Sequence, residues 1–410
     1  MQRIVVSGIG VISPVGIGKE EFWKNLIKGK SGIKRITLFD TSRFKRHYGG
    51  EIKNFDPEKI IPSSLLSVFP RASCFSIFAV KEALEDAKFE IVRQKAKYSL
   101  KNTKKRIAII IGTTMAEANV LDISSERIIK KRWKEISFNL LLNAFSPSTP
   151  RNIGYFFKIE DKNILIPNAC AAGNFALGYG YDLLKKGEVD LAIVGGAESL
   201  SRVAFFGFQK LYAMAPHLCQ PFDKNRKGMI LGEGAGILIL EREKTALERK
   251  ASIYAEVLGY GISSDAYHMT IPKKEGIKKA IKKALEDAKI SIRDVDYINA
   301  HGTGTIQNDK AEAGAIKEVF GSFSKKIRTS SIKSMIGHCM GAASSIEAVA
   351  CCLAIKEGII PPTINFKTPD PECDIDCVPN EARKKRLNIA LNNGFAFGGN
   401  NCCVVFKSYP

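Results

Sequence analysis

The chain has 410 residues, and its 62 Lys and Arg outnumber its 42 Asp and Glu, which gives a formal net charge of +20 at pH 7. Apolar residues make up 45% and charged residues 25% of the chain, which argues against a disordered or fibrous protein. The length exceeds that of a usual single-core domain, so we expect two domains or one large duplicated unit.

The surplus of basic residues favours an acidic partner or a solvated basic surface. These residues form short runs spread along the chain, such as Lys130-Lys131-Arg132. No nucleic-acid motif accompanies them, so nucleic acid is not the predicted partner.

Ten cysteines occur without regular spacing, and no Cys-x-x-Cys is present. Cys373 and Cys377 lack partners at zinc-finger spacing, so we predict no disulfide framework, no metal and no cofactor. Cysteine usage of this kind is typical of a reducing compartment, and no apolar stretch is long enough to span a bilayer. We therefore expect a cytoplasmic protein without a membrane segment.

Apolar runs rich in β-branched residues recur along the chain, with helical patterns between them. The runs lie at residues 4–6, 107–111, 191–194, 237–240 and 404–406. This alternation predicts an α/β fold whose sheets are covered by helices on both faces.

The hexapeptide Ala-Leu-Glu-Asp-Ala-Lys occurs twice, at 83–88 and at 284–289, and each copy ends an amphipathic helix. A polar connection, an apolar strand and a Gly-Thr turn follow each copy, with the turns at Gly112-Thr113 and Gly302-Thr303. The repeat indicates that the two parts of the chain share one plan.

Two further helices, one after Cys170 and one after His338, are rich in Ala, Gly and Ser on several faces. Helices of this composition pack close to neighbouring backbone inside a protein. We therefore predict a duplicated architecture with its junction near 242–252, an N-terminal half at 1–250 and a C-terminal half at 251–410.

Cys170 lies where an apolar run gives way to a helix, within Asn-Ala-Cys-Ala-Ala-Gly at 168–173. Backbone N–H groups and the positive end of the helix dipole would lower the thiol pKa there. The same N–H groups could bind a developing oxyanion. The alternative is a buried, inert cysteine.

Two of the five histidines lie in similar surroundings. His301 ends a predicted strand within Asn-Ala-His-Gly-Thr-Gly-Thr, and His338 precedes the second small-residue helix with Lys333 just upstream. One such histidine is more often structural. Two beside glycine, with a cysteine in the other half, indicate a catalytic site.

The loop at 394–401, Gly-Phe-Ala-Phe-Gly-Gly-Asn-Asn, carries two aromatic residues just before the final strand. This loop is either an ordinary turn or a mobile gate. The glycines at 232–236 lead into a strand and not into a helix, so a dinucleotide site is not predicted.

These segments together resemble the β-ketoacyl-acyl-carrier-protein synthases, most closely the elongating synthase II type. The likeness covers nearly the whole chain and includes further matches at 6–10, 195–198, 221–223, 263–270 and 361–365. The resemblance implies a thiolase-like fold with duplicated αβαβα layers, a homodimer, and an acyltransferase that serves fatty acid biosynthesis. Its substrates would be acyl and malonyl thioesters, delivered by an acidic acyl carrier protein that binds transiently.

The resemblance also implies roles for single residues. Cys170 would accept the acyl chain as a thioester, and its backbone N–H with that of Phe397 would form the oxyanion hole. His301 and His338 would donate hydrogen bonds to the malonyl thioester carbonyl, which promotes decarboxylation and stabilises the enolate. Neutral imidazole N–H groups suit this task because they stabilise an enolate without protonating it.

Several residues would support this chemistry. Lys333 would be a charged support for the histidines, Glu347 an anchor in the following helix, and Phe397 a gate to the acyl pocket. The remaining supporting residues are Phe395, Thr303 and Thr305.

The chain departs from the family pattern at a few positions, namely Ala171, Ala172, Ile336, Ala396 and Asn400. Ala396 replaces a glycine and restricts the backbone where a gate would swing. A specialised synthase of a secondary lipid or polyketide pathway therefore stays open as an alternative. A non-catalytic subunit resembling chain-length factors is disfavoured, because such subunits typically lack the nucleophile.

Overall fold

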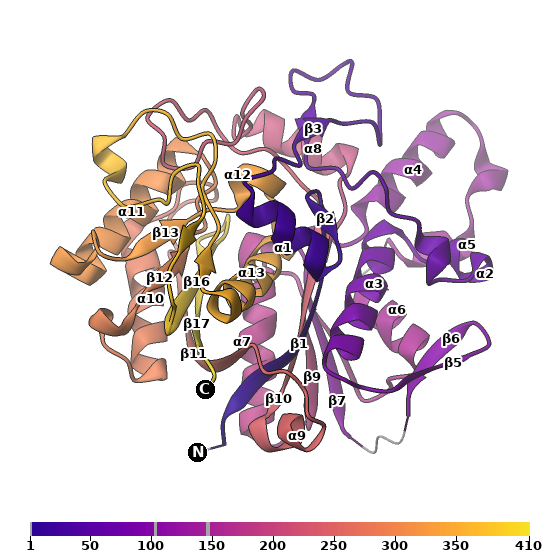
Figure 1. The fold of residues 1–410 in the computed structure, drawn as a ribbon. Coiled ribbons are helices and arrows are strands. Elements are labelled where there is room, and N and C mark those ends of the chain that lie inside the picture. Colours follow the sequence, from indigo (N-terminus) through magenta and orange to yellow (C-terminus); the bar gives the residue numbers. More distant parts are fainter. Residues whose placement is uncertain (1, 102–104, 145–147) are drawn as a thin grey trace.

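The computed structural model describes residues 2–101, 105–144 and 148–410 (Figure 1). One mixed sheet runs through the molecule in the order β13-β12-β16-β17-β11-β1-β10-β9-β7-β8. Its N-terminal half contains β1 (Ile4–Ser13), β7 (Ile107–Gly112), β8 (Lys162–Ile166), β9 (Leu191–Glu198) and β10 (Gly234–Arg242). Its C-terminal half contains β11 (Ala255–Ser264), β12 (Tyr297–Asn299), β13 (Arg328–Ser330), β16 (Ile389–Phe395) and β17 (Asn400–Lys407).

The two half-sheets repeat one plan strand for strand. In the N-terminal half, β1, β10 and β9 pair antiparallel, and β9, β7 and β8 pair parallel. In the C-terminal half, β11, β17 and β16 pair antiparallel, and β16, β12 and β13 pair parallel. The same strand order and directions confirm the predicted duplication.

The half-sheets meet at β1 and β11, where three residue pairs, from Ile4↔Val257 to Val6↔Ala255, join them into a single hydrogen-bonded sheet. The five predicted strands lie in β1, β7, β9, β10 and β17. The polar connection predicted after residue 88 instead contains a hairpin, β5 (Ile91–Gln94) and β6 (Lys97–Leu100).

Five layers result from packing helices on both faces of each half-sheet (Figure 1). Helices α3 (Arg71–Asp86) and α6 (Ser148–Phe157) cover the outer face of the N-terminal half. Helices α10 (Lys274–Ala288) and α11 (Ile306–Phe320) lie on the outer side of the C-terminal half. Between the halves lie α7 (Ala172–Lys185) and α13 (Ala343–Glu357), so the predicted αβαβα order is confirmed.

The two central helices are rich in small residues because their backbones lie close together. A side-chain carbon added at Gly173 would lie 2.6 Å from the backbone nitrogen of Ser345. Three apolar clusters fill the layers, one between the halves and one under each outer helix pair. The central layer is therefore rigid and fixes whatever lies at its helix starts.

The other elements form the edges and the connections. The helices are α1 (Lys19–Ile27), α2 (Ser63–Leu66), α4 (Ala118–Ile129), α5 (Phe138–Leu142), α8 (Arg202–Lys210), α9 (Glu243–Glu248) and α12 (Lys333–Ile336). The short strands are β2 (Gly16–Ile17), β3 (Lys34–Arg35), β4 (Tyr48–Gly49), β14 (Ile359–Ile360) and β15 (Arg383–Lys384). Within the described residues, no helix is both long enough and apolar enough to cross a membrane.

Candidate active site

Cys170 lies at the start of the central helix α7. The chain leaves β8, passes through Ala169 with a left-handed φ of 46°, and makes one 3-10 turn at Ala169–Ala171 before α7 begins. This turn buries the Cys170 side chain to 4% exposure. The sulfur is therefore held at the seam between the two halves of the fold.

His338 lies in the other half, just before the turn that matches the Cys170 turn. It is followed by Met340 with φ 47°, by a 3-10 turn at Met340–Ala342 and by α13. The Nδ1 atom of His338 accepts a hydrogen bond from the Met340 backbone N–H at 3.0 Å. The proton of the neutral ring therefore lies on Nε2, a buried atom that has no hydrogen-bond partner among the described residues.

His301 follows β12 and is held through its backbone. The Glu312 carboxylate, on α11, accepts the N–H groups of His301 at 2.9 Å and Gly302 at 2.8 Å. The His301 ring meets the His338 ring edge to face, with centroids 5.3 Å apart, and lies 5.9 Å from the Phe395 ring. The two imidazoles thus form a pair.

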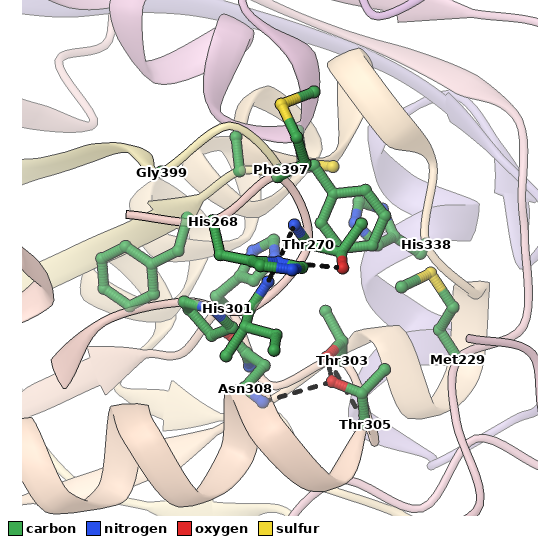
Figure 2. Close-up of a pocket in the computed structure, with 16 residues that line it drawn as sticks. Met229, His268, Thr270, His301, Thr303, Thr305, Asn308, His338, Phe397 and Gly399 are labelled. Atoms are coloured by element: carbon green, nitrogen blue, oxygen red, sulfur yellow. Dashed lines mark hydrogen bonds between the residues drawn. The ribbon is translucent and has the colours of Figure 1, made fainter. Parts of the chain in front are cut away.

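One pocket joins the predicted reactive groups (Figure 2). Cys170 from the N-terminal half lines it together with His301, His338, Phe395 and Phe397 from the C-terminal half. Its empty space is about 420 Å³, counting the open mouth. The other lining residues are Met229, His268, Met269, Thr270, Ile271, Pro272, Thr303, Thr305, Asn308, Ala396 and Gly399.

A buried ion pair lies close to the histidines. Lys333 donates a hydrogen bond to Glu347, and both side chains are fully buried. Burial lowers the pKa of His301 and of His338 well below the usual value, and the Lys333 charge lowers both pKa values further. Both rings are therefore neutral at physiological pH, as the proposed hydrogen-bond donation requires.

The predicted drop in the thiol pKa is wrong for the free protein. Burial raises the pKa of Cys170 to about 12, although Lys333 and the backbone N–H groups of Phe397 and Cys170 lower it. Desolvation of a thiolate outweighs these contacts because the sulfur is removed from water. The two N–H groups nevertheless lie close enough to the sulfur to lower its pKa, so they are candidates for an oxyanion hole beside it.

The loop that carries Phe397 is a tight hairpin between β16 and β17. Gly398 and Gly399 have φ values of 82° and 76°, and the Gly398 N–H donates to the Met269 carbonyl at 2.8 Å. Ala396 lies outside the left-handed region. The alanine therefore fits this loop conformation without backbone strain.

The remaining predicted residues also lie at this site. Thr303 and Thr305 line the pocket, and their hydroxyl groups are 2.9 Å apart (Figure 2). Lys333 and Glu347 lie outside the pocket lining, and the Lys333 charge adds to burial in lowering the pKa of His301 and of His338. The structure thus places every predicted site residue in or next to one cavity.

Sequence reasoning missed two buried carboxylates that build the site. Glu312 holds the His301 loop, as described above. Glu198 accepts backbone N–H groups of Thr114 at 2.6 Å, Met115 at 3.1 Å and Gly341 at 3.0 Å, so it ties the N-terminal half to the turn after His338. The Gly-Gly-Ala-Glu segment at 195–198 was part of the resemblance, but no spacing indicated what its carboxylate binds.

Within the described residues, no group of three or more His, Cys, Asp or Glu side chains could hold a metal ion.

Two family models cover most of the chain. "Beta-ketoacyl synthase, N-terminal domain" matches residues 1–246, and "Beta-ketoacyl synthase, C-terminal domain" matches 254–367. The chain belongs to the β-ketoacyl synthase family. This result confirms the predicted family, the predicted fold and the acyltransferase class.

Relatives of this synthase match over its full length. The 3-oxoacyl-[acyl-carrier-protein] synthase 2 of Synechocystis sp. is 38% identical over 421 residues, which cover 100% of this chain and 98% of the relative. Among solved structures, the ishigamide ketosynthase/chain length factor matches with a TM-score of 0.92 and 39% identity, and both chains are fully covered. A type II PKS acyl-carrier protein in complex with its ketosynthase matches with a TM-score of 0.89 and 32% identity, again over both full chains.

Proposed function

We propose that this synthase catalyses a decarboxylative Claisen condensation, in which an acyl group on Cys170 is joined to a malonyl group on an acyl carrier protein. The product is a 3-oxoacyl carrier thioester, which is an intermediate of fatty acid biosynthesis. The observation that carries the proposal is the shared pocket, where one sulfur meets two neutral imidazoles across the seam of the fold.

The first step loads the acyl chain. The Cys170 sulfur attacks the acyl thioester, the carrier thiol leaves, and the proton of the cysteine thiol passes to it. The oxyanion of the tetrahedral intermediate would lie at the N–H groups of Cys170 and Phe397, both of which lower the pKa of the Cys170 thiol. Preorganised donors of this kind stabilise a charge that appears only along the reaction.

The second step forms the carbon–carbon bond. The malonyl carboxylate leaves as CO₂, and the negative charge moves onto the thioester oxygen, where His301 and His338 donate hydrogen bonds. The unpartnered Nε2–H of His338 is available for this purpose. The enolate carbon then attacks the acyl carbonyl, and the Cys170 thiolate leaves.

The other predicted residues support these steps. Burial keeps the imidazoles neutral, and the charge of Lys333, which is paired with Glu347, lowers their pKa values further. Thr303 and Thr305 stand at the pocket wall, where their hydroxyls can bind the polar arm of a carrier. Phe395 packs on His301, and Phe397 separates the sulfur from an apolar cluster.

We further propose an acidic acyl carrier protein as a transient partner and a homodimer as the working form. The net charge of +20 supports an acidic partner, and a solved relative is a complex with its carrier protein. Strand β8 lies at the end of the sheet and leaves the half-buried Ile164, Leu165 and Ile166 at its edge, which supports pairing with a second copy.

The cytoplasm is the proposed compartment, and the domains proposed are residues 1–250 and 251–410. All ten cysteines are free and buried, which supports a reducing environment. The repeated half-sheets support the domain division.

A specialised pathway is the second candidate. The ishigamide ketosynthase/chain length factor is 39% identical to this chain, about as similar as the 3-oxoacyl-[acyl-carrier-protein] synthase 2 of Synechocystis sp. at 38%. The nucleophile and both histidines are present, so a catalytic subunit is favoured over a chain-length factor in either pathway.

A turnover panel tests the proposal. Purified protein is mixed with malonyl carrier and with acyl carriers of graded chain length, and the products are read by mass spectrometry. The proposal expects 3-oxoacyl carriers that are two carbons longer than the acyl substrate, with release of CO₂. Absence of any such product over the whole range of chain lengths would overturn it, and the preferred length separates the two pathways.

A further inference from the structure

The ring of the gate residue Phe397 stacks on a second aromatic ring outside the pocket. Phe208, on helix α8, lies with its ring centroid 5.7 Å from that of Phe397 at an interplanar angle of 24°. Phe208 is 7% exposed and does not line the pocket that holds Cys170. Phe397 therefore stands between the pocket on one side and Phe208 on the other.

Behind the gate lies an apolar cluster with an unusual share of methionine. Four of the seven methionines of the chain, Met115, Met214, Met229 and Met340, pack there with Phe208. Methionine side chains are flexible and fill irregular space, so a cluster of them can rearrange around a guest. Met229 also lines the Cys170 pocket, so the cluster and the pocket share a wall.

Helix α8 is fixed on several sides. The Ser201 side chain caps its first turn, and Arg202 binds Asp122 and Glu126 of α4. Further along α8, the Gln209 side chain accepts the backbone N–H groups of Lys45 and Arg46. The helix that carries Phe208 is therefore anchored at both of its ends.

The gate loop is held mainly by backbone hydrogen bonds at Ala396, Gly398 and Gly399. Its hydrogen bonds include the Gly398 N–H to Met269 and the closure of the hairpin between Ala396 and Asn400. Two consecutive glycines with positive φ follow the gate residue, so the backbone can move there with little strain. Of the two stacked rings, Phe397 is the one that can swing.

Resting on the proposed function, we propose that Phe208 determines acyl-chain specificity: its ring holds Phe397 in the closed position between Cys170 and the methionine-rich cluster. An acyl chain longer than a few carbons must separate the two rings to enter the cluster, whereas an acetyl group fits in front of the gate. Longer acyl chains therefore load onto Cys170 more slowly than acetyl groups, and the strength of the stack between Phe208 and Phe397 sets the difference.

The test measures single-turnover acylation of Cys170 by mass spectrometry, with carriers that bear acetyl, octanoyl and dodecanoyl groups. The variants are Phe208→Ala, which removes the ring, and Phe208→Leu, which keeps most of the volume but cannot stack. Phe206→Ala is the control, because this ring lies on the same helix, is 50% exposed and packs on Phe44 instead of Phe397. Thermal unfolding of each protein reports whether the fold is kept.

Both Phe208 variants should raise the ratio of dodecanoyl to acetyl acylation about fivefold, which corresponds to the loss of one aromatic pair. Phe206→Ala should leave the ratio unchanged. An unchanged ratio in Phe208→Leu would overturn the inference, even if Phe208→Ala does not fold. If none of the three acyl carriers acylates Cys170 in the unmodified protein, the failure is that of the proposed function and not of the role of Phe208.

Discussion

The turn that carries Cys170 and the turn that follows His338 have similar backbone conformations but different side chains. Each passes through a residue with φ near 46°, makes one 3-10 turn and starts a central helix. The position of Cys170 in the first turn is taken by Gly341 in the second. There, a side-chain carbon would lie 2.3 Å from the Thr113 backbone, so no side chain fits.

The comparison shows how a duplicated fold acquires an asymmetric site. The first turn faces the pocket and presents a sulfur. The second turn faces the buried carboxylate of Glu198, to which Gly341 donates its N–H, and it leaves catalysis to the preceding His338. The common backbone fixes the positions, and the surroundings of each turn decide which side chain is possible.

The largest expected effect is that of Cys170→Ala. Condensation should fall by at least about 10³-fold, as is found when a nucleophile is removed, and the fold should be kept because the matching turn already accommodates a small residue. Decarboxylation of malonyl carrier should continue, since the histidine pair is intact. Product formation and CO₂ release measure the two activities, and residual condensation above one thousandth of the starting rate would count against Cys170 as the nucleophile.

His338→Ala should lower the rate of malonyl decarboxylation by about 10²–10³-fold, because one preorganised donor is worth about 3 kcal/mol. Acylation of Cys170 should stay within a few fold of the unmodified rate. His217→Ala, at an exposed position, is the control. A parallel loss of both activities would instead indicate general damage to the turn.

Gly341→Ala should reduce the free energy of unfolding by about 1–3 kcal/mol, because the new methyl group overlaps the Thr113 backbone. Gly207→Ala is the matched control: the added carbon meets nothing within 4 Å, and alanine in a helix interior should raise stability by about 0.5–1 kcal/mol. Urea unfolding measures both. Equal effects in the two variants would show that the second turn has room for a side chain.

The neutral histidines give a smaller effect that depends on pH. Burial holds the pKa of His338 far below its unfolded value, so the unfolded chain binds a proton that the folded chain does not as pH falls below about 6.5. The contribution of neutral His338 to the free energy of unfolding is present above pH 6.5. It is lost as pH falls below that value, at up to about 1.4 kcal/mol per pH unit.

Between pH 6.5 and 5.5, the unmodified protein should therefore lose about 1 kcal/mol of stability relative to His338→Ala. Burial raises the pKa of Glu198 and of Glu347 to about 7, and stability from these groups changes with pH in the opposite direction. They are present in both proteins, so their effect largely cancels. A difference that stays constant with pH would mean that His338 is not held neutral by the fold.

Local pattern was enough to predict an α/β fold with a duplicated plan, and the family resemblance implied its five layers. Five apolar runs marked five strands, the repeated hexapeptide marked the ends of α3 and α10, and small residues marked the two central helices. These features depend on periodicity and on residue size, which are visible over a few residues. Local surroundings also marked Cys170, His301 and His338, and the family resemblance supplied their roles. These three residues line one cavity.

What the sequence could not predict depends on contacts between distant segments. Glu312 reaches the His301 backbone from another element, and Phe208 stacks on a ring almost 190 positions further along the chain. The pKa of Cys170 was predicted in the wrong direction because the turn's N–H groups are visible in the sequence, whereas the extent of burial is not.

The central claim is that Cys170 and the two histidines act on one substrate pair in one pocket, and a single-turnover experiment tests it most directly. Protein acylated from an acyl carrier is mixed rapidly with malonyl carrier, and peptide mass spectrometry follows the acyl group on Cys170. We predict that the acyl group leaves Cys170 as 3-oxoacyl product in the unmodified protein and persists there in His338→Ala. An acyl group that never appears on Cys170, or that leaves the variant at the unmodified rate, would contradict the account.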